Sequence, residues 1–387
     1  MKKIKTIGIL GMGAVGISIA YILQQLGFEV IAFKRDRVAS HQFCDLMHRG
    51  KIKIINKTKN INSTGNLDVK ITHSLDEIAN QSDLILNCCR FPPISRAYQF
   101  DESEKDSIRK NNTPIIAFPG KLGSTWLIDS EYTGVGLIAY SPVFATKKVI
   151  DQEDPSIVVT ILDIKRGIPL AHNDLDTRLF LLSFFNKYFE FNENTPFFID
   201  GGSVLKTALS SPVAAINAAA ICDNAKGLFL SQGKPIKETI YALSSEYSRL
   251  FQEVFNEQLA IANLLQIKNV PTIQDWLKSR IKENESGDIT EMLHHIYKNH
   301  AITISGKDRR IVESYNALLY FKSFASTFGQ KVEATEQLIK EIDTLKNVLS
   351  SFYEYEIDNS LIEESAVMHA RDSISKNQKE EKILICN

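Results

Sequence analysis

The segment GMGAVG, at residues 11–16, most constrains the fold that this chain can adopt. Its three glycines have the spacing G-x-G-x-x-G: Gly11, Gly13 and Gly16. An apolar run with β-branched members, residues 5–10, precedes them, and residues 17–26 follow with apolar side chains at helical spacing. A second apolar run occupies residues 28–33. We therefore predict strand, glycine turn, helix and strand, which is the opening unit of a doubly wound α/β sheet.

Each glycine of such a unit has a physical task. The first permits a tight turn, the second lets the backbone approach a diphosphate, and the third lets the helix pack closely on the strand. The unpaired N–H groups at the start of the helix can then donate hydrogen bonds to phosphate oxygens. We therefore assign five residues to the binding of a dinucleotide: Gly11, Gly13, Ala14, Val15 and Gly16.

The end of the second strand, VIAFKRDR, indicates which dinucleotide binds. An Asp or Glu in this place usually holds the ribose 2′-hydroxyl of NAD, whereas cations hold the 2′-phosphate of NADP. Lys34 and Arg35 occupy or adjoin this place, so the sequence favours NADP(H) over NAD(H). The alternative is that these cations lie in a solvated loop and that Asp36 serves an NAD ribose.

A further contact to the dinucleotide follows the apolar strand predicted at residues 83–89. In a doubly wound sheet, the loops after the carboxyl ends of the strands line the cofactor crevice. We therefore add Cys89 and Arg90 to the cofactor-binding residues.

Two structural halves are evident along the chain. Strands and helices alternate in the first half, which favours a parallel sheet with helices on both faces. The second half has helical periodicity almost throughout, and residues 205–226 read as one helix buried on all sides. We predict a Rossmann domain at 1–185, an all-α domain for substrate binding or dimerisation at 186–355, and a polar, frayed tail at 356–387.

Composition narrows the class of partner. The 387 residues carry a formal net charge of -1, which argues against a surface for nucleic acid or anionic membrane. No apolar run looks long enough to span a bilayer, and the first strand leaves no room for a signal sequence. Five irregularly placed cysteines suggest neither a disulfide framework nor a metal site. We expect a cytoplasmic protein with a small-molecule substrate, whose helical half could support a homodimer.

Four segments carry a resemblance to a known family: FPGKLGSTW, IVVTILDIKRGIPLA (read as a strand pair), VLKTALSSPVAAINAAA and KDRRIVESYNALLYF. Together they resemble the octopine/nopaline (opine) dehydrogenase family, in order, from Lys3 to about Leu349. That family condenses the amino group of an amino acid with a 2-oxo acid and reduces the imine with NAD(P)H. The resemblance implies an oxidoreductase whose active site lies between the two domains.

The catalytic pair of that family is replaced here. Asn217 stands where the family has its acid/base histidine, and Ser314 stands where the histidine has its aspartate partner. An amide does not titrate near neutrality, so Asn217 can orient a group but cannot be the general acid. Lys206 and Glu313 are the nearest ionisable groups, and Arg310 can clamp a carboxylate. Four residues are therefore the catalytic candidates: Lys206, Asn217, Glu313 and Arg310.

Other interpretations stay open. Lys206 can reach solvent from the start of its helix, and Glu313 can form a surface pair with a neighbouring arginine. A lysine on an inner helix is also used by the ketopantoate reductase family, but the asparagines that follow it there are Ser210 and Ala214 here. The alternatives are a ketopantoate-type 2-oxo acid reductase and a catalytically altered protein that binds NADP(H) without turnover.

Overall fold

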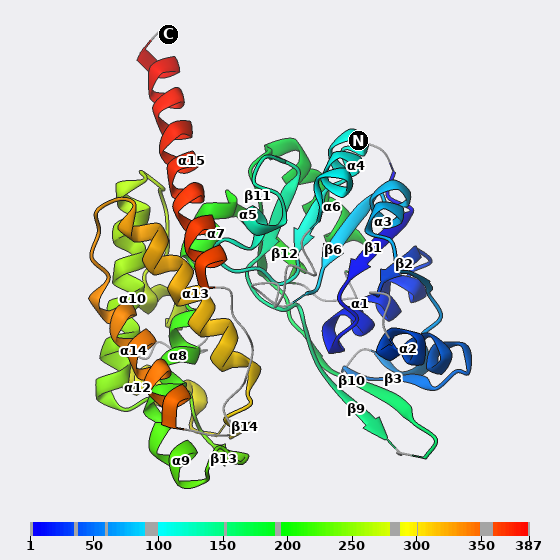
Figure 1. The fold of residues 1–387 in the computed structure, drawn as a ribbon, viewed down its shortest axis with the longest axis horizontal. Coiled ribbons are helices and arrows are strands. Elements are labelled where there is room, and N and C mark those ends of the chain that lie inside the picture. The colour runs from blue at the N-terminus through cyan, green and yellow to red at the C-terminus, as the bar shows by residue number, and fades with distance from the viewer. Residues whose placement is uncertain are drawn as a thin grey trace. The chain divides into compact units, whose positions relative to one another are not determined.

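The computed structural model describes residues 3–34, 38–58, 61–89, 100–150, 153–189, 195–278, 287–299, 301–348 and 359–385. The chain forms two compact units, Met1–Gly120 with Ser124–Thr207, and Lys121–Gly123 with Ala208–Asn387 (Figure 1). The change of unit after Thr207 comes later than the boundary expected after residue 185. Residues up to Gly202 stay in the first unit because its outermost strand ends there.

The first unit is built on an eight-stranded sheet with the order β12-β11-β8-β7-β6-β1-β2-β5. Its strands are β1 Thr6–Leu10, β2 Glu29–Phe33, β5 Lys70–Thr72, β6 Leu84–Asn87, β7 Ile115–Ala117, β8 Val135–Ile138, β11 Ile168–His172 and β12 Phe198–Gly202. Six neighbouring strands of this sheet are parallel to one another: β8, β7, β6, β1, β2 and β5. The predicted Rossmann sheet is confirmed, with β11 added antiparallel to β8 and β12 parallel to β11.

Helices cover both faces of this sheet. They are α1 Ala14–Gln25, α2 Val38–His48, α3 Leu75–Gln81, α4 Glu102–Asn111, α5 Ser124–Ile128 and α6 Leu175–Tyr188. Side chains alternate along β1, so that Ile7 and Ile9 enter the core that includes α1 and α6. Leu10 enters a second core with residues of α3, α4 and α5. The alternation of β1 therefore divides its apolar residues between two helical layers.

A second sheet in this unit was not anticipated from the sequence. It has the order β4-β3-β10-β9 and consists of β3 Ile52–Thr58, β4 Ile61–Asn66, β9 Val143–Ile150 and β10 Ser156–Ile164. The segment IVVTILDIKRGIPLA therefore contributes β10 to this sheet and β11 to the eight-stranded one. It is not a hairpin pair within one sheet. Figure 1 shows β9 and β10 as the long pair of green strands.

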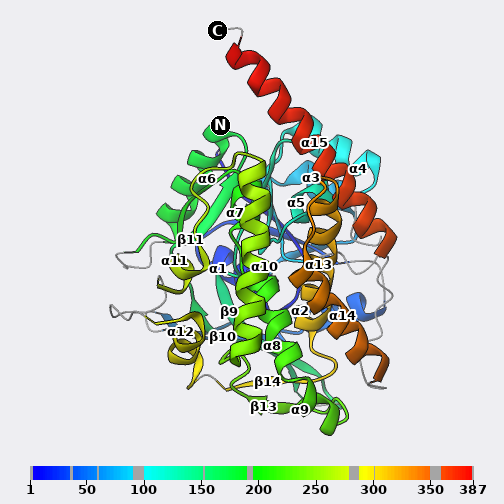
Figure 2. The same ribbon diagram turned by 90° about the vertical axis from the view of Figure 1, so that its left-hand side faces the viewer.

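Where the structure describes the second unit, its only strands form a two-stranded ribbon, β13 Ile236–Glu238 paired with β14 Ile302–Ile304, and its other regular elements are helices. Its helices are α8 Val213–Asp223, α9 Ala225–Leu230, α10 Ser245–Leu264, α11 Ile273–Lys278, α12 Ile289–Tyr297, α13 Arg309–Ser326, α14 Glu333–Val348 and α15 Asn359–Ile385. Helices α8, α10, α13 and α14 pack against one another (Figure 2).

The stretch expected as one helix at residues 205–226 is divided. Helix α7, Val204–Leu209, spans the change of unit, and α8 begins after Pro212, which is its N-cap. Proline lacks an N–H donor and disfavours helical backbone in the residue before it, so a continuous helix cannot pass this point. Eight consecutive residues of α8 are buried, from Ala215 to Cys222, which confirms burial on all sides for this part.

By length and mean hydropathy alone, Val204–Asp223 could cross a membrane, contrary to the expectation that no such stretch exists. Its most apolar window has a hydropathy of 1.4, and 72% of that window is buried inside the protein. Burial of this extent is that of a core helix.

The C-terminal region differs from the frayed tail that its polarity suggests. Residues Asn359–Ile385 form α15, and its first half packs against α13. Ile362, Ala366 and Ala370 are buried at a spacing of four residues. This spacing places them on one face of the helix, so a sparse apolar stripe is enough to hold α15 on the helical unit.

Candidate active site

The glycine turn between β1 and α1 has no room for a side chain at two of its three glycines. Gly11 has a φ of +88°, and a Cβ on it would lie 2.9 Å from backbone atoms of Cys88 and Cys89. A Cβ on Gly16 would lie 2.0 Å from the carbonyl oxygen of Gly11. The first and third glycines are therefore required by the turn and by the contact of α1 with the strand.

Gly13 differs from its neighbours because it borders open space. No described atom lies within 4 Å of a Cβ built on it, and it is the N-cap of α1. Among the described residues no side chain caps this helix, and its first turn has no acidic residue. The N–H groups that begin α1, with half-buried Ala14 and Val15, therefore face a space suited to a diphosphate. The residues of the turn fit the group that the motif predicts.

Cys89, which the sequence analysis assigns to cofactor binding, lies against this turn. It follows β6, its N–H donates to Asn87 Oδ1 at 3.0 Å, and its sulfur would lie 3.0 Å from a Cβ on Gly11. Burial raises the pKa of the preceding thiol, Cys88, well above its ordinary value, so that group is a packing residue. The other candidate in this loop, Arg90, lies outside the described residues.

The cations expected at the end of β2 are described in part. Lys34 follows β2, and its Nζ lies 4.4 Å from the centre of the Phe43 ring. A second lysine, Lys147 on β9, has its Nζ 5.6 Å from the same ring. Burial lowers the pKa of both amines, and the charge of Lys34 lowers that of Lys147 further. Arg35 lies outside the described residues.

Sequence reasoning missed Lys147, because β9 is distant in the chain and belongs to the other sheet. The two ammonium groups and the ring that both of them approach form what we call the Phe43 cation pair: Lys34, Phe43 and Lys147. Two like charges on one ring repel each other, and a bound dianion would relieve that repulsion.

Two of the four catalytic candidates are connected in the helical unit through a tyrosine. Tyr241 donates its hydroxyl hydrogen to Asn217 Oδ1 at 2.6 Å and also interacts with Arg310. Asp308 accepts from Nε of Arg310 at 2.8 Å and from its Nη2, which fixes the guanidinium at the start of α13. The amide of Asn217 is therefore satisfied by Tyr241, which the sequence did not single out.

The protonation of this network follows from its burial. Burial raises the pKa of Tyr241, and the charge of Arg310 opposes that shift only in part. Burial alone would lower the pKa of Arg310, but its hydrogen bonds to Asp308 and Tyr241 and its charge interactions with both groups together outweigh burial and keep the guanidinium charged. The network thus holds a neutral phenol and a paired cation at neutral pH.

The third candidate, Glu313, forms an ion pair that the sequence did not suggest. Its Oε2 lies 3.6 Å from Nζ of Lys121, and the two side chains are only 22% and 14% exposed. Ser314, which the sequence resemblance aligns with the family's aspartate, is fully buried on the same helix. The fourth candidate, Lys206, belongs to the first unit, in α7, and its N–H donates to Ser203 Oγ at 3.2 Å.

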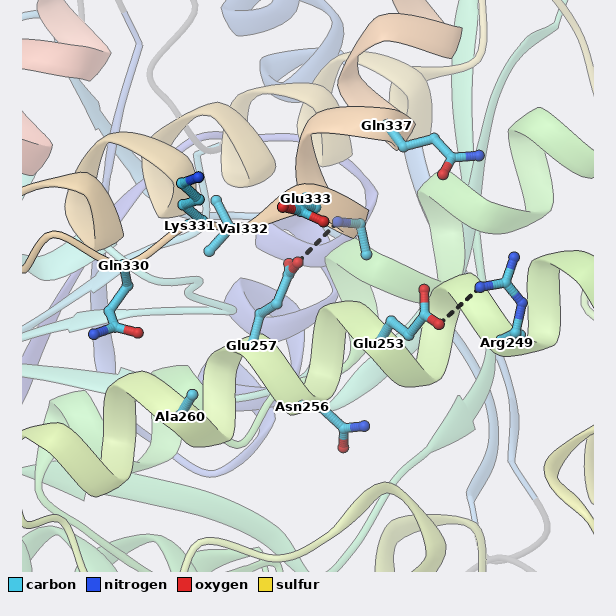
Figure 3. A pocket seen from close by; sticks show the side chains of 11 residues that line it. Arg249, Glu253, Asn256, Glu257, Ala260, Gln330, Lys331, Val332, Glu333 and Gln337 are labelled. Carbon is cyan, nitrogen blue, oxygen red and sulfur yellow. Dashed lines mark hydrogen bonds and ion pairs between the residues drawn. The ribbon is translucent and has the colours of Figure 1, made fainter.

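A surface pocket of about 610 Å³ lies elsewhere in the helical unit, between α10 and the start of α14 (Figure 3). Glu257 dominates it and accepts the backbone N–H groups of Ala334 and Thr335 at 2.8 and 3.1 Å. This carboxylate caps α14, and no predicted site residue lines the pocket. The Glu257 carboxylate thus has a structural explanation in the capping of a helix.

Comparison with solved structures finds the same fold over most of the chain. A structure of octopine dehydrogenase with NADH and L-arginine has a TM-score of 0.67 and 14% identity, over 92% of this chain and 91% of that one. Yersinopine dehydrogenase with NADP+ has a TM-score of 0.68 and 10% identity, over 96% and 99%. A 2-dehydropantoate 2-reductase from Geobacter metallireducens GS-15 has a TM-score of 0.57 and 16% identity, over 88% and 99%.

Comparisons with protein-family models and with curated protein sequences find no match. The structural matches are higher in TM-score for the two opine dehydrogenases than for the reductase. The chain therefore has the fold of octopine and yersinopine dehydrogenase, as its four sequence segments predict.

Proposed function

We propose that this protein is an NADP-dependent oxidoreductase that reduces a C=O or C=N carbon of a small carboxylate substrate. The observation that carries the proposal is the uncapped start of α1 beside Gly13, in a fold whose solved members hold NADH or NADP+. The residues of the glycine turn would hold the diphosphate. A bound reduced nicotinamide would supply the hydride.

The preference for NADP(H) is supported by the Phe43 cation pair. A 2′-phosphate carries two negative charges near neutrality and can accept several hydrogen bonds from ammonium groups. Lys34 follows the strand whose end meets the adenosine ribose in this fold, and Lys147 lies on the same ring. An NAD ribose offers no charge that would offset the repulsion between these amines.

A 2-oxo acid is the substrate class that best suits the proposal. The octopine dehydrogenase structures hold L-arginine, agmatine or pyruvate, which are amines or a 2-oxo acid. The test is NADPH oxidation by the purified protein with a panel of 2-oxo acids, each with and without amino acids. Turnover that requires both partners supports an opine dehydrogenase-like reaction.

Two other outcomes of that panel discriminate the alternatives. Turnover with a 2-oxo acid alone favours a 2-oxo acid reductase, which the match to 2-dehydropantoate 2-reductase makes the second candidate. Tight binding of NADPH without turnover for any substrate would contradict an oxidoreductase and leave a nucleotide-binding protein.

Cofactor selectivity has a sharper test in two lysine substitutions. Lys34→Ala or Lys147→Ala should each weaken NADPH binding about 10- to 100-fold, because a hydrogen bond to a charged group contributes about 1.5–3 kcal/mol. NADH affinity should not change. Isothermal titration with both cofactors measures the effect.

Lys148→Ala is the matched control. Lys147 and Lys148 are both exposed and adjacent on β9, so their side chains lie on opposite faces of the strand. Its removal should leave both affinities unchanged. Equal affinity of the wild-type protein for NADPH and NADH would refute the proposed selectivity.

A further inference from the structure

Lys121 lies in the loop after β7 and is not among the catalytic candidates predicted from the sequence. It follows Gly120, whose N–H donates to the Ile138 carbonyl oxygen at 2.8 Å, just after the carboxyl end of β7. Two residues later Gly123 has a φ of +84° and lies against Tyr320, so that a Cβ there would be 2.3 Å from the ring. The backbone on both sides of Lys121 is thus fixed.

The side chain of Lys121 is withdrawn from solvent and held by a carboxylate. Only 14% of it is exposed, and Glu313 Oε2 lies 3.6 Å from its Nζ. By contrast, a second described lysine–glutamate pair involves Lys322 of α13 and Glu336 of α14, and its side chains are 43% and 52% exposed. Removing an ammonium group from water is unfavourable. A buried lysine–glutamate pair therefore adds little stability beyond what an apolar contact of similar size would give.

We propose that Lys121 donates the proton in the reduction and that Glu313 positions its ammonium group. This inference rests on the proposed function, and it supplies the acid that Asn217 and Ser314 cannot provide. Ligands of doubly wound sheets bind outside the carboxyl ends of the strands, and the residues after β7 lie at such an end.

The electrostatic surroundings suit a proton donor. Burial lowers the pKa of Lys121 from that of an ordinary lysine, the charge of Glu313 opposes the shift, and Arg309 adds to it. An acid whose pKa lies nearer the working pH transfers its proton more readily than an ordinary lysine does. Glu313 keeps enough of the amine protonated to act.

The balanced step is as follows. A bound reduced nicotinamide would supply a hydride, with its two electrons, to the carbon of the C=O or C=N group. The π electron pair of that bond moves to the oxygen or nitrogen, which takes a proton from Nζ of Lys121. The neutral amine that remains then regains a proton from water.

The test compares Lys121→Arg and Lys121→Met with the wild-type protein. Loss of a general acid lowers kcat about 100- to 10,000-fold, and NADPH affinity should stay at the wild-type value. Lys121→Arg keeps a cation beside Glu313 but cannot release a proton near neutrality, so it should be as impaired as Lys121→Met. Lys322→Met removes the lysine of the exposed pair with Glu336. It is the matched control and should keep full activity.

A second readout does not need turnover. The rate of acetylation of Lys121 in the ligand-free protein, followed by mass spectrometry against pH, reports the pKa of its amine. Glu313→Gln removes the negative charge that favours the ammonium form, so this pKa should fall. The basic limb of the pH–kcat profile should move to lower pH by the same amount, which a purely structural ion pair would not cause.

The outcomes separate this inference from the proposed function. If the wild-type protein turns over but Lys121→Arg retains wild-type kcat, Lys121 serves only as a charge and the inference is wrong while the function stands. A pH profile unmoved by Glu313→Gln contradicts the inference in the same way. If no substrate of the panel is reduced by the wild-type protein, both fall together.

Discussion

The roles of single residues differ in how far they can be predicted from the sequence. Gly11, Gly13 and Gly16 could be assigned from sequence alone, because their task depends on local backbone geometry and their spacing is local too. Tyr241 and Lys121 could not, since each gains its meaning from a partner far along the chain. A tyrosine or lysine in a polar segment carries no signal of the group that it will contact.

His172 is a residue whose burial has a consequence for stability. It ends β11, is 1% exposed, and accepts the N–H of Asp174 on Nδ1 at 3.0 Å. Burial lowers its pKa below the ordinary 6.5, although its backbone hydrogen bonds oppose the shift. The unfolded chain then binds a proton at a higher pH than the folded chain does. Stability is therefore fully present above about pH 6.5 and falls as the pH decreases below it.

We predict that His172→Asn reduces this dependence on pH. The Oδ1 of asparagine can replace Nδ1 as the acceptor from Asp174, but the amide does not titrate. Urea unfolding should show a smaller loss of stability between pH 7 and pH 5 than in the wild-type protein. His48→Asn, at an exposed position in α2, should keep the wild-type slope. Equal slopes for His172→Asn and wild type would show that another group causes the loss.

Secondary-structure elements were predicted best where their pattern is local. The βα alternation of the first unit and the helical periodicity of the second half are both found in the structure. The division at Pro212 was overlooked because apolar residues continue across it. The second sheet was missed for another reason. Its strand β3 pairs with β10, about a hundred residues later in the chain. Hydrophobic periodicity reports only on local structure, so it does not show which distant strands pair.

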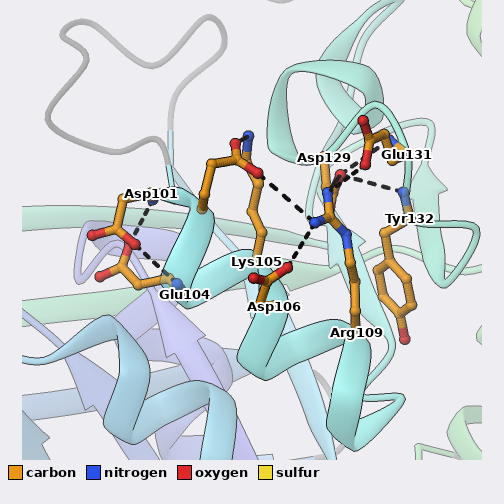
Figure 4. A network of polar contacts seen from close by, with 9 residues as sticks. Asp101, Glu104, Lys105, Asp106, Arg109, Asp129, Glu131 and Tyr132 are labelled. Carbon is orange, nitrogen blue, oxygen red and sulfur yellow. Dashed lines mark hydrogen bonds and ion pairs between the residues drawn. The ribbon is translucent and has the colours of Figure 1, made fainter.

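Helix α4 shows how an element is fixed by one buried charge (Figure 4). Asp101 begins the helix through a capping box with Glu104. Near its end, Arg109 donates to Asp129 Oδ1 at 3.0 Å, and the Asp129 side chain is only 2% exposed. The same oxygen accepts the N–H of Glu131 at 3.0 Å. The hydrogen bond to Asp129 raises the pKa of Arg109, and this pair joins α4 to the segment after α5.

Arg109→Met should therefore destabilise the first unit. It leaves the Asp129 carboxylate buried without a cation, and removing one partner of a buried pair lowers the free energy of unfolding by about 3 kcal/mol. Lys105→Met removes a pair with Glu102, whose side chain is 73% exposed, and should cost about 1 kcal/mol or less. Urea titration of both variants measures the difference. Equal losses would mean that Asp129 is stabilised by its backbone donors alone.

At the scale of the whole molecule, fold and chemistry are supported to different degrees. The fold follows from many weak local signals, and the solved dehydrogenases share it at 10 to 14% identity. The chemistry depends on a few side chains, and the sequence resemblance aligns Asn217 with the family's acid/base histidine and Ser314 with the aspartate partner of that histidine. The central claim is therefore that a nicotinamide dinucleotide binds at the start of α1, whichever residue supplies the proton.

Gly13→Asp tests that claim most directly. Gly13 has extended backbone with a φ of -81°, has room for a side chain, and is the N-cap of α1, a position that aspartate favours. The variant should fold with an unchanged or higher Tm, while its carboxylate occupies the N–H groups and repels a diphosphate. Isothermal titration should then show NADPH binding by the wild-type protein and none by the variant. NADPH binding of equal strength to both proteins would contradict the account.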